Sequence, residues 1–423
     1  MTVLYLFLAF FVLLALSLPI GIAILVPCIG YILLGGNMQP NLFISSFFSA
    51  LDSFPLLAVP LFMLSGELMT RGGIAKQLFD LAHKIVGRFA GGHAMAAVIA
   101  CLFFGAVSGS APATVAAIGG LMIPMLSDIG YDRKWATGLL AAAGSLGVMI
   151  PPSIPMVMYG VVTGNSVSDL FIAGIIPGII VGAFLCVYCF VYCQVVKPDL
   201  HWEAENKSFL QVLNESKWAI LMPIIILGGI YGGIFTPTEA AAVSVAYGLV
   251  ICIFVTKTIS IASLPGLFKS TAASMGPLMV VCASATVLGK ILTVEHAPEI
   301  IANLITSVTN NKFVILLLIN VFLLIVGALM DTVAAILIFA PVLSPIVSAL
   351  GMDLIQFGCV MTVNLAVGFI TPPVGMNLYV ASGMTGLSIP EISKKIVIPM
   401  CLMIVAVLLV TYVPALSLGL LGR

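Results

Sequence analysis

The feature that most constrains this chain is a pair of apolar segments interrupted by glycine, serine and proline, which occurs twice. In the first half, residues 105–118 read GAVSGSAPATVAAI and residues 144–152 read GSLGVMIPP. In the second half, TVAAI returns at residues 332–336, and the double proline returns in GFITPP at residues 368–373. Broken helix at membrane depth is tolerated only where it is buried in protein or lines a wet cavity. The duplication therefore predicts a membrane transporter with one broken-helix site in each half.

The composition agrees with a chain that lies in the lipid bilayer. Its 423 residues are 61% hydrophobic and 8% charged, and the mean hydropathy is +1.25. Soluble globular domains do not have this composition. The net charge is zero, so nothing indicates a nucleic acid as a partner. We expect an all-α polytopic membrane protein.

Two apolar stretches have a length that fits neither one membrane crossing nor two. As a straight helix, residues 95–127 would extend roughly 50 Å at ~1.5 Å per residue, whereas two crossings of a ~30 Å hydrocarbon core need about 60 Å. A re-entrant hairpin that turns near the middle of the bilayer, at residues 108–112, fits better. Residues 313–346 repeat this length, with a tip at residues 327–332. The sequence therefore predicts two re-entrant helical hairpins.

Charge placement gives the hairpins opposite orientations. Basic residues before and after the first hairpin place both its ends in the cytoplasm by the positive-inside rule, and the count of crossings brings the second hairpin in from the other side. This is inverted-repeat topology. The predicted first half is residues 1–196, which contain hairpin 95–127 and broken helix 136–163. A cytoplasmic linker, residues 197–217, follows. The predicted second half is residues 218–423, which contain hairpin 313–346 and broken helix 356–383.

Local patterns add four expectations about single elements. Residues 3–35 are predicted to form one bent transmembrane helix, and the next helix, residues 43–70, is predicted to break near Pro60. The apolar residues between positions 71 and 88 follow a helical period, which is typical of an amphipathic helix at the membrane interface. Thr236-Pro-Thr-Glu239 reads as a capping box, a structural rather than a functional motif.

The broken helices supply oxygen ligands for a cation. A proline removes the hydrogen bond to the carbonyl four residues earlier, so the double prolines free the carbonyls of Gly147, Val148, Gly368 and Phe369. Such oxygens, together with nearby hydroxyls, are hard ligands that suit a sodium ion. The alternative is that glycine and proline only kink packed helices. The predicted ligands are Ser108, Ser110, Gly147 and Ile150 in one site, and Gly327, Asp331, Thr332, Gly368 and Thr371 in its counterpart.

The returning arms of both hairpins begin like helix N-termini, with Ser110 and Asp331 as caps. Free amides and the positive end of a helix dipole suit an anionic substrate. Asp331 would repel an anion, so it is assigned to the cation, with capping alone as the alternative. The predicted substrate-binding residues are Ser110, Ala111, Pro112, Thr114, Pro152, Ser153, Pro373 and Asn377.

Four motifs taken together resemble the large membrane subunit of a tripartite ATP-independent periplasmic (TRAP) transporter. They are SGSAPAT at residues 108–114, GVMIPPS at 147–153, FTPTEAA at 235–241 and TPPVGMN at 371–377. The resemblance covers the whole chain. It implies a sodium-driven elevator in a bacterial inner membrane that imports an organic acid such as a sialic acid or a C4-dicarboxylate. It also implies two partners, a separate small four-helix membrane subunit and a periplasmic substrate-binding protein.

Three other functions are alternatives to transport by a TRAP system. An intramembrane protease is not expected, because the four histidines lie in predicted interfacial or loop regions and no second deep carboxylate accompanies Asp331. A channel formed by a ring of subunits would not require two inverted broken-helix pairs in one chain. A sodium-coupled anion symporter that works without a binding protein would leave the same signals, and it stays open as the alternative.

Overall fold

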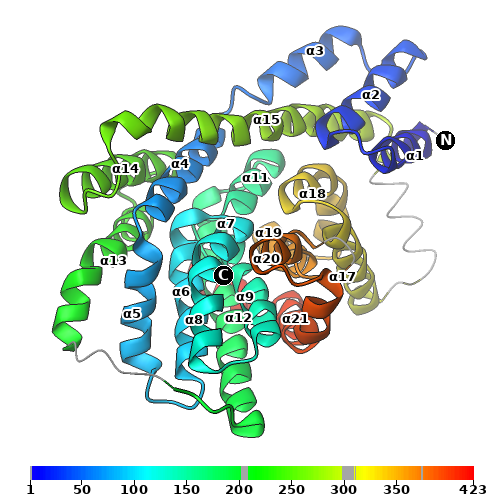
Figure 1. Cartoon of the computed structure of the whole chain (residues 1–423). Helices are drawn as coiled ribbons and strands as arrows, with labels where there is room; N and C mark the ends of the chain where they lie inside the picture. Colours follow the sequence, from blue (N-terminus) through cyan, green and yellow to red (C-terminus); the bar gives the residue numbers. More distant parts are fainter. Residues whose placement is uncertain (1, 202–207, 298–308, 310, 373–374) are drawn as a thin grey trace.

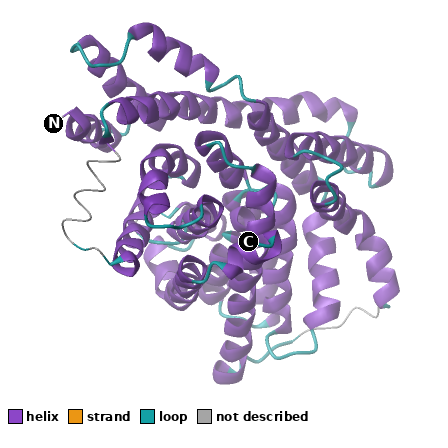
Figure 2. Ribbon diagram, turned by 180° about the vertical axis from the view of Figure 1, so that it is seen from behind, coloured by secondary structure: helices purple, strands orange, loops and turns teal. Residues whose placement is uncertain are grey.

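The computed structural model describes residues 2–201, 208–297, 309, 311–372 and 375–423. These residues form helices and connecting loops without a strand (Figures 1 and 2). Nine of the helices in these ranges are long and apolar enough to cross a membrane, or ten if one bent pair counts as a single span. The predicted all-α polytopic class is confirmed.

One group of helices borders the molecule along two sides, and we call these the outer helices. In Figure 1, α15 runs along the upper edge, while α5 and α13 stand on the left. The group comprises α1 (Thr2–Ala15), α2 (Ile20–Leu33), α3 (Pro40–Ser49), a 3-10 turn (Phe54–Leu57), α4 (Ala58–Arg71), α5 (Ile74–Val86), α13 (Phe209–Tyr231), α14 (Pro237–Val250) with a π-helical end (Ile251–Val255), and α15 (Leu264–Val294).

The remaining helices form a central body that contains both hairpins and both broken helices (Figure 1). Its first part comprises α6 (Gly92–Ser108), α7 (Ala111–Thr114), a π-helix (Val115–Gly119), α8 (Gly120–Ile129), α9 (Arg133–Gly144), α10 (Leu146–Met149), α11 (Ile154–Thr163) and α12 (Val167–Val196). Its second part comprises α17 (Lys312–Leu329), α18 (Thr332–Ala349), α19 (Leu354–Gly368), α20 (Met376–Thr385), α21 (Ile389–Tyr412) and α22 (Ala415–Leu418).

The broken helices occupy the centre of this body. The most apolar stretch of the span Arg133–Thr163 is entirely buried inside the protein, whereas only a third of the corresponding stretch of α13 is buried. Large apolar side chains are exposed mainly at the periphery, as on Leu33, Leu34 and Ile224. A helix that is surrounded by protein can lose backbone hydrogen bonds without exposing the freed N–H and C=O groups to lipid. This central position therefore permits the breaks.

Helices end and restart inside the predicted segments: between α6 and α7, between α17 and α18, after Met149 and after Gly368. The re-entrant hairpins and the division into two halves stay predictions. The expected amphipathic helix is α5, and the capping box is confirmed, since Thr236 caps α14 and Glu239 accepts the Thr236 N–H. Helix α13 begins inside the segment predicted to be a linker. Residues 209–217 are helical rather than linker, because Ser208 and Gln211 form a capping box that starts α13 at Phe209.

The prediction of one bent helix over residues 3–35 is wrong. The chain forms two short helices, α1 and α2, that pack against each other. Ser17 adopts a left-handed conformation with φ 63°, and Pro19 then cannot continue α1 because it lacks an N–H group. The predicted break near Pro60 is also displaced. The 44° bend falls between α3 and the turn before α4, whereas Pro60 lies in the first turn of α4, where its missing N–H is not needed.

Candidate functional site

The tip of the first hairpin is a connected cluster of oxygens. α6 ends at Ser108, and Gly109 turns the chain with a left-handed φ of 59°. The Thr114 hydroxyl donates to the Ser110 carbonyl at 2.8 Å and lies 3.1 Å from the Ser108 hydroxyl. Ser110 caps the return arm, since its hydroxyl accepts the Ala113 N–H at 3.5 Å. Two hydroxyls and one carbonyl therefore meet at the turn.

The first broken helix lies in backbone contact with this tip. Helix α10 ends at Met149, and helix resumes only at Ile154. A Cβ atom added to Gly147 would lie 2.6 Å from the Ser110 carbonyl oxygen, and one added to Gly109 would lie 2.9 Å from the Pro152 carbonyl oxygen. The structure thus brings the predicted ligands Ser108, Ser110 and Gly147 together.

Ile150, the fourth residue predicted for this site, lies at the break itself. Its side chain packs toward Gly178 on α12, where an added Cβ would overlap it. The backbone carbonyl is therefore the part of Ile150 that a cation would use.

The second hairpin and broken helix repeat this contact. α17 ends at Leu329, and Asp331 caps α18 by accepting the Val333 N–H at 2.8 Å. Gly368, the last residue of α19, packs onto the hairpin, because a Cβ added to it would lie 2.5 Å from the Gly327 Cα. The capping role of Asp331, considered from the sequence, is thus present.

Two hydroxyls of the second site differ in their partners. Thr332 is buried, and its hydroxyl has no hydrogen-bond partner among the described residues. An unpartnered buried oxygen is uncommon in proteins and calls for an explanation such as a bound ion. The Thr371 hydroxyl instead donates to the Val367 carbonyl at 2.9 Å. Thr332 is therefore the stronger candidate ligand.

The repeated pentapeptide does not occupy equivalent positions in the two halves. Thr114 follows its cap, Ser110, by four residues, whereas Thr332 follows its cap, Asp331, directly. After Thr114 the first arm continues as a π-helix, while the second arm is regular from its start. The structural counterparts are therefore the caps Ser110 and Asp331, and the two copies of TVAAI are offset by three residues.

Of the residues predicted to bind substrate, several have structural partners. Ser153 is fully buried and caps α11, and its hydroxyl donates to the carbonyl of Val148, which Pro152 leaves free. Asn377 donates from Nδ2 to the Ala141 carbonyl and the Ser145 hydroxyl, at 3.0 and 3.1 Å.

The other predicted residues differ in their position. The Asn377 Oδ1 is buried without a partner among the described residues. Ala111 and Pro112 are the first residues of the return arm, and Ala111 is buried. Pro152 contacts the tip through its carbonyl oxygen, as described above. Pro373 lies outside the described residues.

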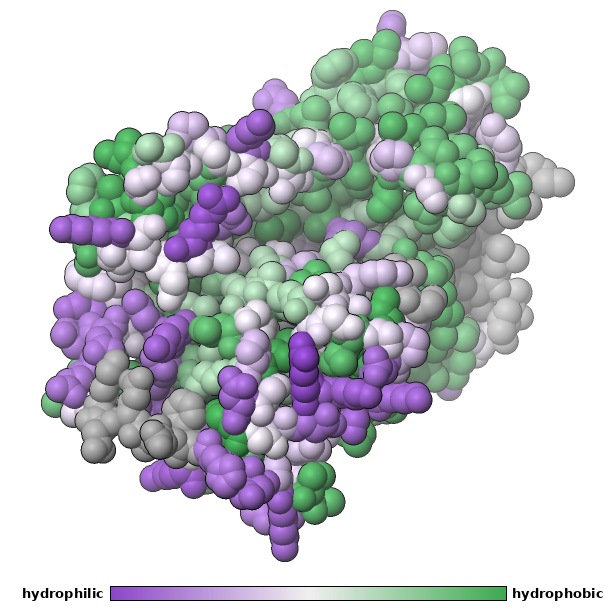
Figure 3. Space-filling model, in the orientation of Figure 1, coloured by the Kyte–Doolittle hydropathy of each residue, from purple (hydrophilic) through white to green (hydrophobic). Residues whose placement is uncertain are grey.

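A polar pocket of about 230 Å³ separates the first tip from the outer helices. The tip contributes Ser108 and Ser110, and Gly66 on α4 lines the pocket where α4 meets the tip, since a Cβ there would lie 2.9 Å from the Ser108 Cα. In Figure 3 the surface is hollowed between the outer helices and the central body, with hydrophilic residues around the hollow. The polar residues that the outer helices contribute to the pocket are Glu67, Thr70, Ser270, Thr271 and Ser274.

Sequence reasoning missed these residues of the outer helices. Residues 270, 271 and 274 do have a spacing that places them on one face of a helix, and α15 is otherwise largely apolar. That signal does not reveal which element the polar face meets, because α15 and the hairpin tip are far apart in the chain.

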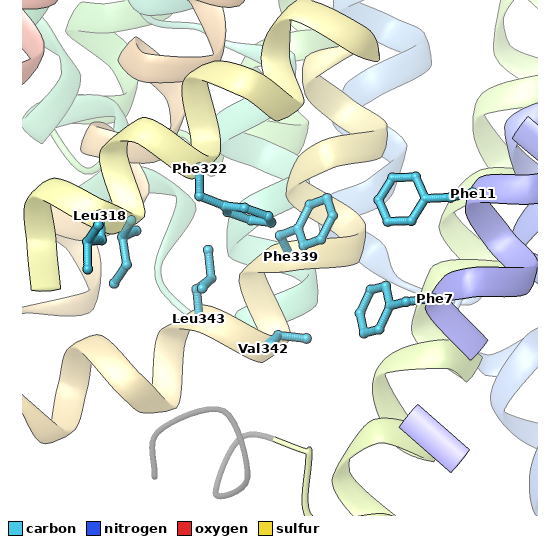
Figure 4. A pocket seen from close by; sticks show the side chains of 8 residues that line it. Phe7, Phe11, Leu318, Phe322, Phe339, Val342 and Leu343 are labelled. Atoms are coloured by element: carbon cyan, nitrogen blue, oxygen red, sulfur yellow. The ribbon is translucent and has the colours of Figure 1, made fainter. Parts of the chain in front are cut away.

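A second pocket is larger, about 410 Å³, and entirely apolar in its side chains (Figure 4). It lies between α1 and the pair α17 and α18, where Phe7 stacks on Phe339 at a centroid distance of 6.3 Å. It offers an anion neither a donor nor a positive charge. The polar pocket is therefore the better candidate for an anionic substrate.

A buried polar network inside the second half was also missed. Asn364 donates from Nδ2 to the Asn320 carbonyl and side-chain oxygens, at 3.1 and 2.8 Å, and Asn320 donates to the Thr411 hydroxyl at 3.1 Å. These bonds join α17, α19 and α21, one to two helical turns before Gly327 and Gly368 in the sequence. The network fixes one hairpin arm against the broken helix.

Comparisons with known proteins agree with this architecture. The family model described as "Tripartite ATP-independent periplasmic transporter, DctM component" matches residues 7–416. The chain is 42% identical to the isethionate TRAP transporter permease protein DctMQ of Oleidesulfovibrio alaskensis, over 96% of this chain and 64% of that protein. It thus spans somewhat less than two thirds of the length of that relative.

Other relatives are matched over most of their length. The C4-dicarboxylate TRAP transporter large permease DctM of Pseudomonas aeruginosa is 39% identical over 88% of this chain and 87% of its own, and the sialic acid large permease SiaM of Vibrio cholerae is 34% identical over 86% of each. Among solved structures, the YdaH transporter of Alcanivorax borkumensis has a TM-score of 0.57 at 17% identity and 89% coverage of both chains, which shows a shared fold.

Proposed function

The chain belongs to the DctM family of TRAP transporter large permeases, and on that premise we propose that it imports an organic acid by sodium-coupled secondary active transport. It is a multi-pass membrane protein of a bacterial transporter family. We place it in the inner membrane and assign it no enzymatic reaction. Two contacts between a hairpin tip and a broken helix support the proposed coupling ion, substrate site and movement.

The observation that carries the proposal is that each hairpin tip lies in backbone contact with a broken helix. Gly147 meets Ser110 in the first pair, and Gly368 meets Gly327 in the second. Each contact gathers carbonyl and hydroxyl oxygens in a buried place, which is the ligand chemistry of a small hard cation. We assign one sodium ion to Ser108, Ser110, Gly147 and Ile150, and another to Gly327, Asp331, Thr332, Gly368 and Thr371.

Coupling between ion and substrate follows from residues that serve both. Ser108 and Ser110 belong to the first oxygen cluster and also line the polar pocket. A cation held between the tip and Gly147 would fix the tip, and with it one wall of the pocket. Loss of the cation would release that wall. Sodium would therefore raise the affinity for the substrate, and the substrate would raise the affinity for sodium by the same factor.

The pocket also suggests how the substrate crosses the membrane. One wall belongs to the central body and the other to α4 and α15 of the outer helices. Sliding of the central body along the outer helices would carry the tip and its bound anion away from the second wall. This is an elevator movement, with the outer helices as the fixed scaffold.

Two partners complete the proposed system. A periplasmic binding protein delivers the acid, and a separate small four-helix membrane subunit associates with this chain. The relatives named for C4-dicarboxylate, sialic acid and isethionate make an organic anion the expected substrate class.

Uptake of labelled acids into proteoliposomes tests the proposal. The chain is reconstituted with its small membrane subunit, and uptake is measured with and without the cognate binding protein, under an inward sodium or potassium gradient. We expect uptake only with sodium and the binding protein. Uptake driven equally by potassium would contradict sodium coupling, and full uptake without the binding protein would favour the independent symporter.

A further inference from the structure

The wall that the outer helices contribute to the polar pocket presents hydrogen-bond acceptors. Its four hydroxyls each donate their proton to their own helix: Thr70 to Gly66 at 2.8 Å, Ser270 and Thr271 to Leu267 at 2.8 and 3.1 Å, and Ser274 to Ser270 at 3.1 Å. A hydroxyl has one proton and two acceptor lone pairs. Since the protons are used, this wall offers its lone pairs to the pocket.

Glu67 adds a carboxylate to the same wall. Arg71 pairs with it, but both contacts, from Nε at 2.9 Å and from Nη2 at 2.8 Å, go to Oε1. Arg71 is not among the residues that line the pocket. The second carboxylate oxygen, Oε2, strengthens the acceptor character of the wall and disfavours a negative group placed against it.

The opposite wall, on the central body, carries two hydroxyls: Ser108 donates its proton to the Ser110 carbonyl at 3.4 Å, and Ser110 supplies the donor. The Ser110 hydroxyl accepts the Ala113 N–H, which leaves its own proton for a ligand. Ser110 also begins the continuous helical arm Ala111–Ile129, whose positive dipole end lies at this tip. The pocket thus runs from a donor wall to an acceptor wall. Its volume of about 230 Å³ is below the ~300–1,000 Å³ of most ligand sites, so it suits a small molecule.

We propose that this pocket selects a short organic anion that carries a hydrogen-bond donor, a hydroxyl or an ammonium group, at the end opposite its acidic group. The acidic group lies at Ser110, and the donor lies against Thr271, Ser274 and Glu67. An unsubstituted dicarboxylate is disfavoured, because its second carboxylate would face acceptors and Glu67. This inference rests on the proposed function, and it names the substrate class within it.

Matched pairs of acids test the inference. Binding is measured by isothermal titration calorimetry on the full chain with its small membrane subunit in nanodiscs, in sodium buffer and in potassium buffer. The pairs are 2-hydroxyethanesulfonate with ethanesulfonate, and 3-hydroxypropanoate with propanoate. We expect the hydroxylated member of each pair to bind about tenfold more tightly, because the analogue leaves the acceptor wall unpaired.

Variants of the acceptor wall identify the source of the preference. Thr271→Val combined with Ser274→Ala is expected to reduce the ratio of affinities within each pair to near one, and Glu67→Gln is expected to improve succinate binding. The matched control is Thr286→Val on the same helix, whose hydroxyl also donates to its own helix, at 2.9 Å to Cys282, outside the pocket. It should leave the ratio unchanged. If the double variant does not fold, Ser274→Ala alone is used.

The outcomes separate this inference from the function on which it rests. Sodium-dependent binding with equal affinity for both members of each pair would overturn the inference and leave the proposed function intact. An unchanged ratio in the folded Thr271→Val and Ser274→Ala variant would overturn it as well. Failure of every acid to bind in a sodium-dependent manner, with or without a hydroxyl, would instead count against the proposed function.

Discussion

Gly327 and Gly368 lie in direct backbone contact, and this contact joins the second hairpin to the second broken helix. A Cβ added to Gly368 would lie 2.5 Å from the Gly327 Cα and 2.5 Å from its carbonyl oxygen. Distances below 3.0 Å are not tolerated by real Cβ atoms, and the atoms met here belong to the backbone, which cannot rotate away. The carbonyl oxygens at this place therefore keep their positions only while residue 368 is glycine.

The first prediction concerns Gly368→Ala. The added methyl should push the hairpin from the broken helix, at an overpacking cost of about 1–3 kcal/mol. Sodium-dependent uptake in proteoliposomes should fall at least about tenfold. The control is Gly276→Ala on α15, where an added Cβ meets nothing within 4 Å. Normal sodium-dependent uptake by Gly368→Ala would show that the contact is not needed.

The second prediction separates the two roles considered for Asp331. Asparagine caps helices about as well as aspartate, so Asp331→Asn should keep the bond to the Val333 N–H and the folded protein. It removes the negative charge, and the sodium concentration that gives half-maximal uptake should therefore rise at least about tenfold. An unchanged sodium dependence would mean that Asp331 acts as a cap only.

The third prediction uses the unpartnered Thr332 hydroxyl. Thr332→Val keeps the shape of the side chain and removes the oxygen. If that oxygen binds sodium, the variant should lose the thermal stabilisation that sodium gives to the wild type, while Thr332→Ser should retain it. In sodium-free buffer the valine variant should be about as stable as the wild type or more stable, since no hydrogen bond is lost. Full stabilisation by sodium in Thr332→Val would remove this residue from the ligand set.

The fourth prediction concerns the buried network of Asn320, Asn364 and Thr411. Asn364→Ala removes two bonds to Asn320 and leaves the Asn320 side-chain oxygen with only a 3.5 Å contact to the Thr411 hydroxyl, so the free energy of unfolding should fall by about 1–3 kcal/mol. Thermal unfolding in nanodiscs measures the loss. Thr362→Ala serves as the control, because its buried hydroxyl donates only to its own helix, at Gly358. Equal melting temperatures for the two variants would contradict a role of the network.

Local sequence chemistry was sufficient to predict where the helices stop and restart and which residues cap them. Proline and glycine act on the backbone within a few residues, so the breaks near Pro151 and Pro372 and the cap at Ser110 follow from the chain itself. The same reasoning failed at Ser17, whose left-handed conformation splits the expected first helix, because no proline or glycine pattern marks a serine for that conformation.

Contacts between segments that are distant in the chain could not be predicted from the sequence. The pairing of Asn320 with Asn364 and the meeting of Thr271 with the hairpin tip depend on how helices pack, and single residues in apolar helices do not indicate their partners. The repeated TVAAI suggested that Thr114 and Thr332 are equivalent. Their different distances from the caps show that identical sequence segments need not occupy equivalent structural positions.

The central claim is that a sodium ion between the first hairpin tip and the first broken helix holds one wall of the substrate pocket. The most direct test is a pair of high-resolution cryo-electron microscopy maps of the complex, one in sodium and one in a buffer of a bulky organic cation. We expect density for an ion beside the Ser110 carbonyl and the Ser108 hydroxyl, opposite Gly147, in the sodium map only. Maps that are identical at this place, with the tip equally ordered in both, would contradict it.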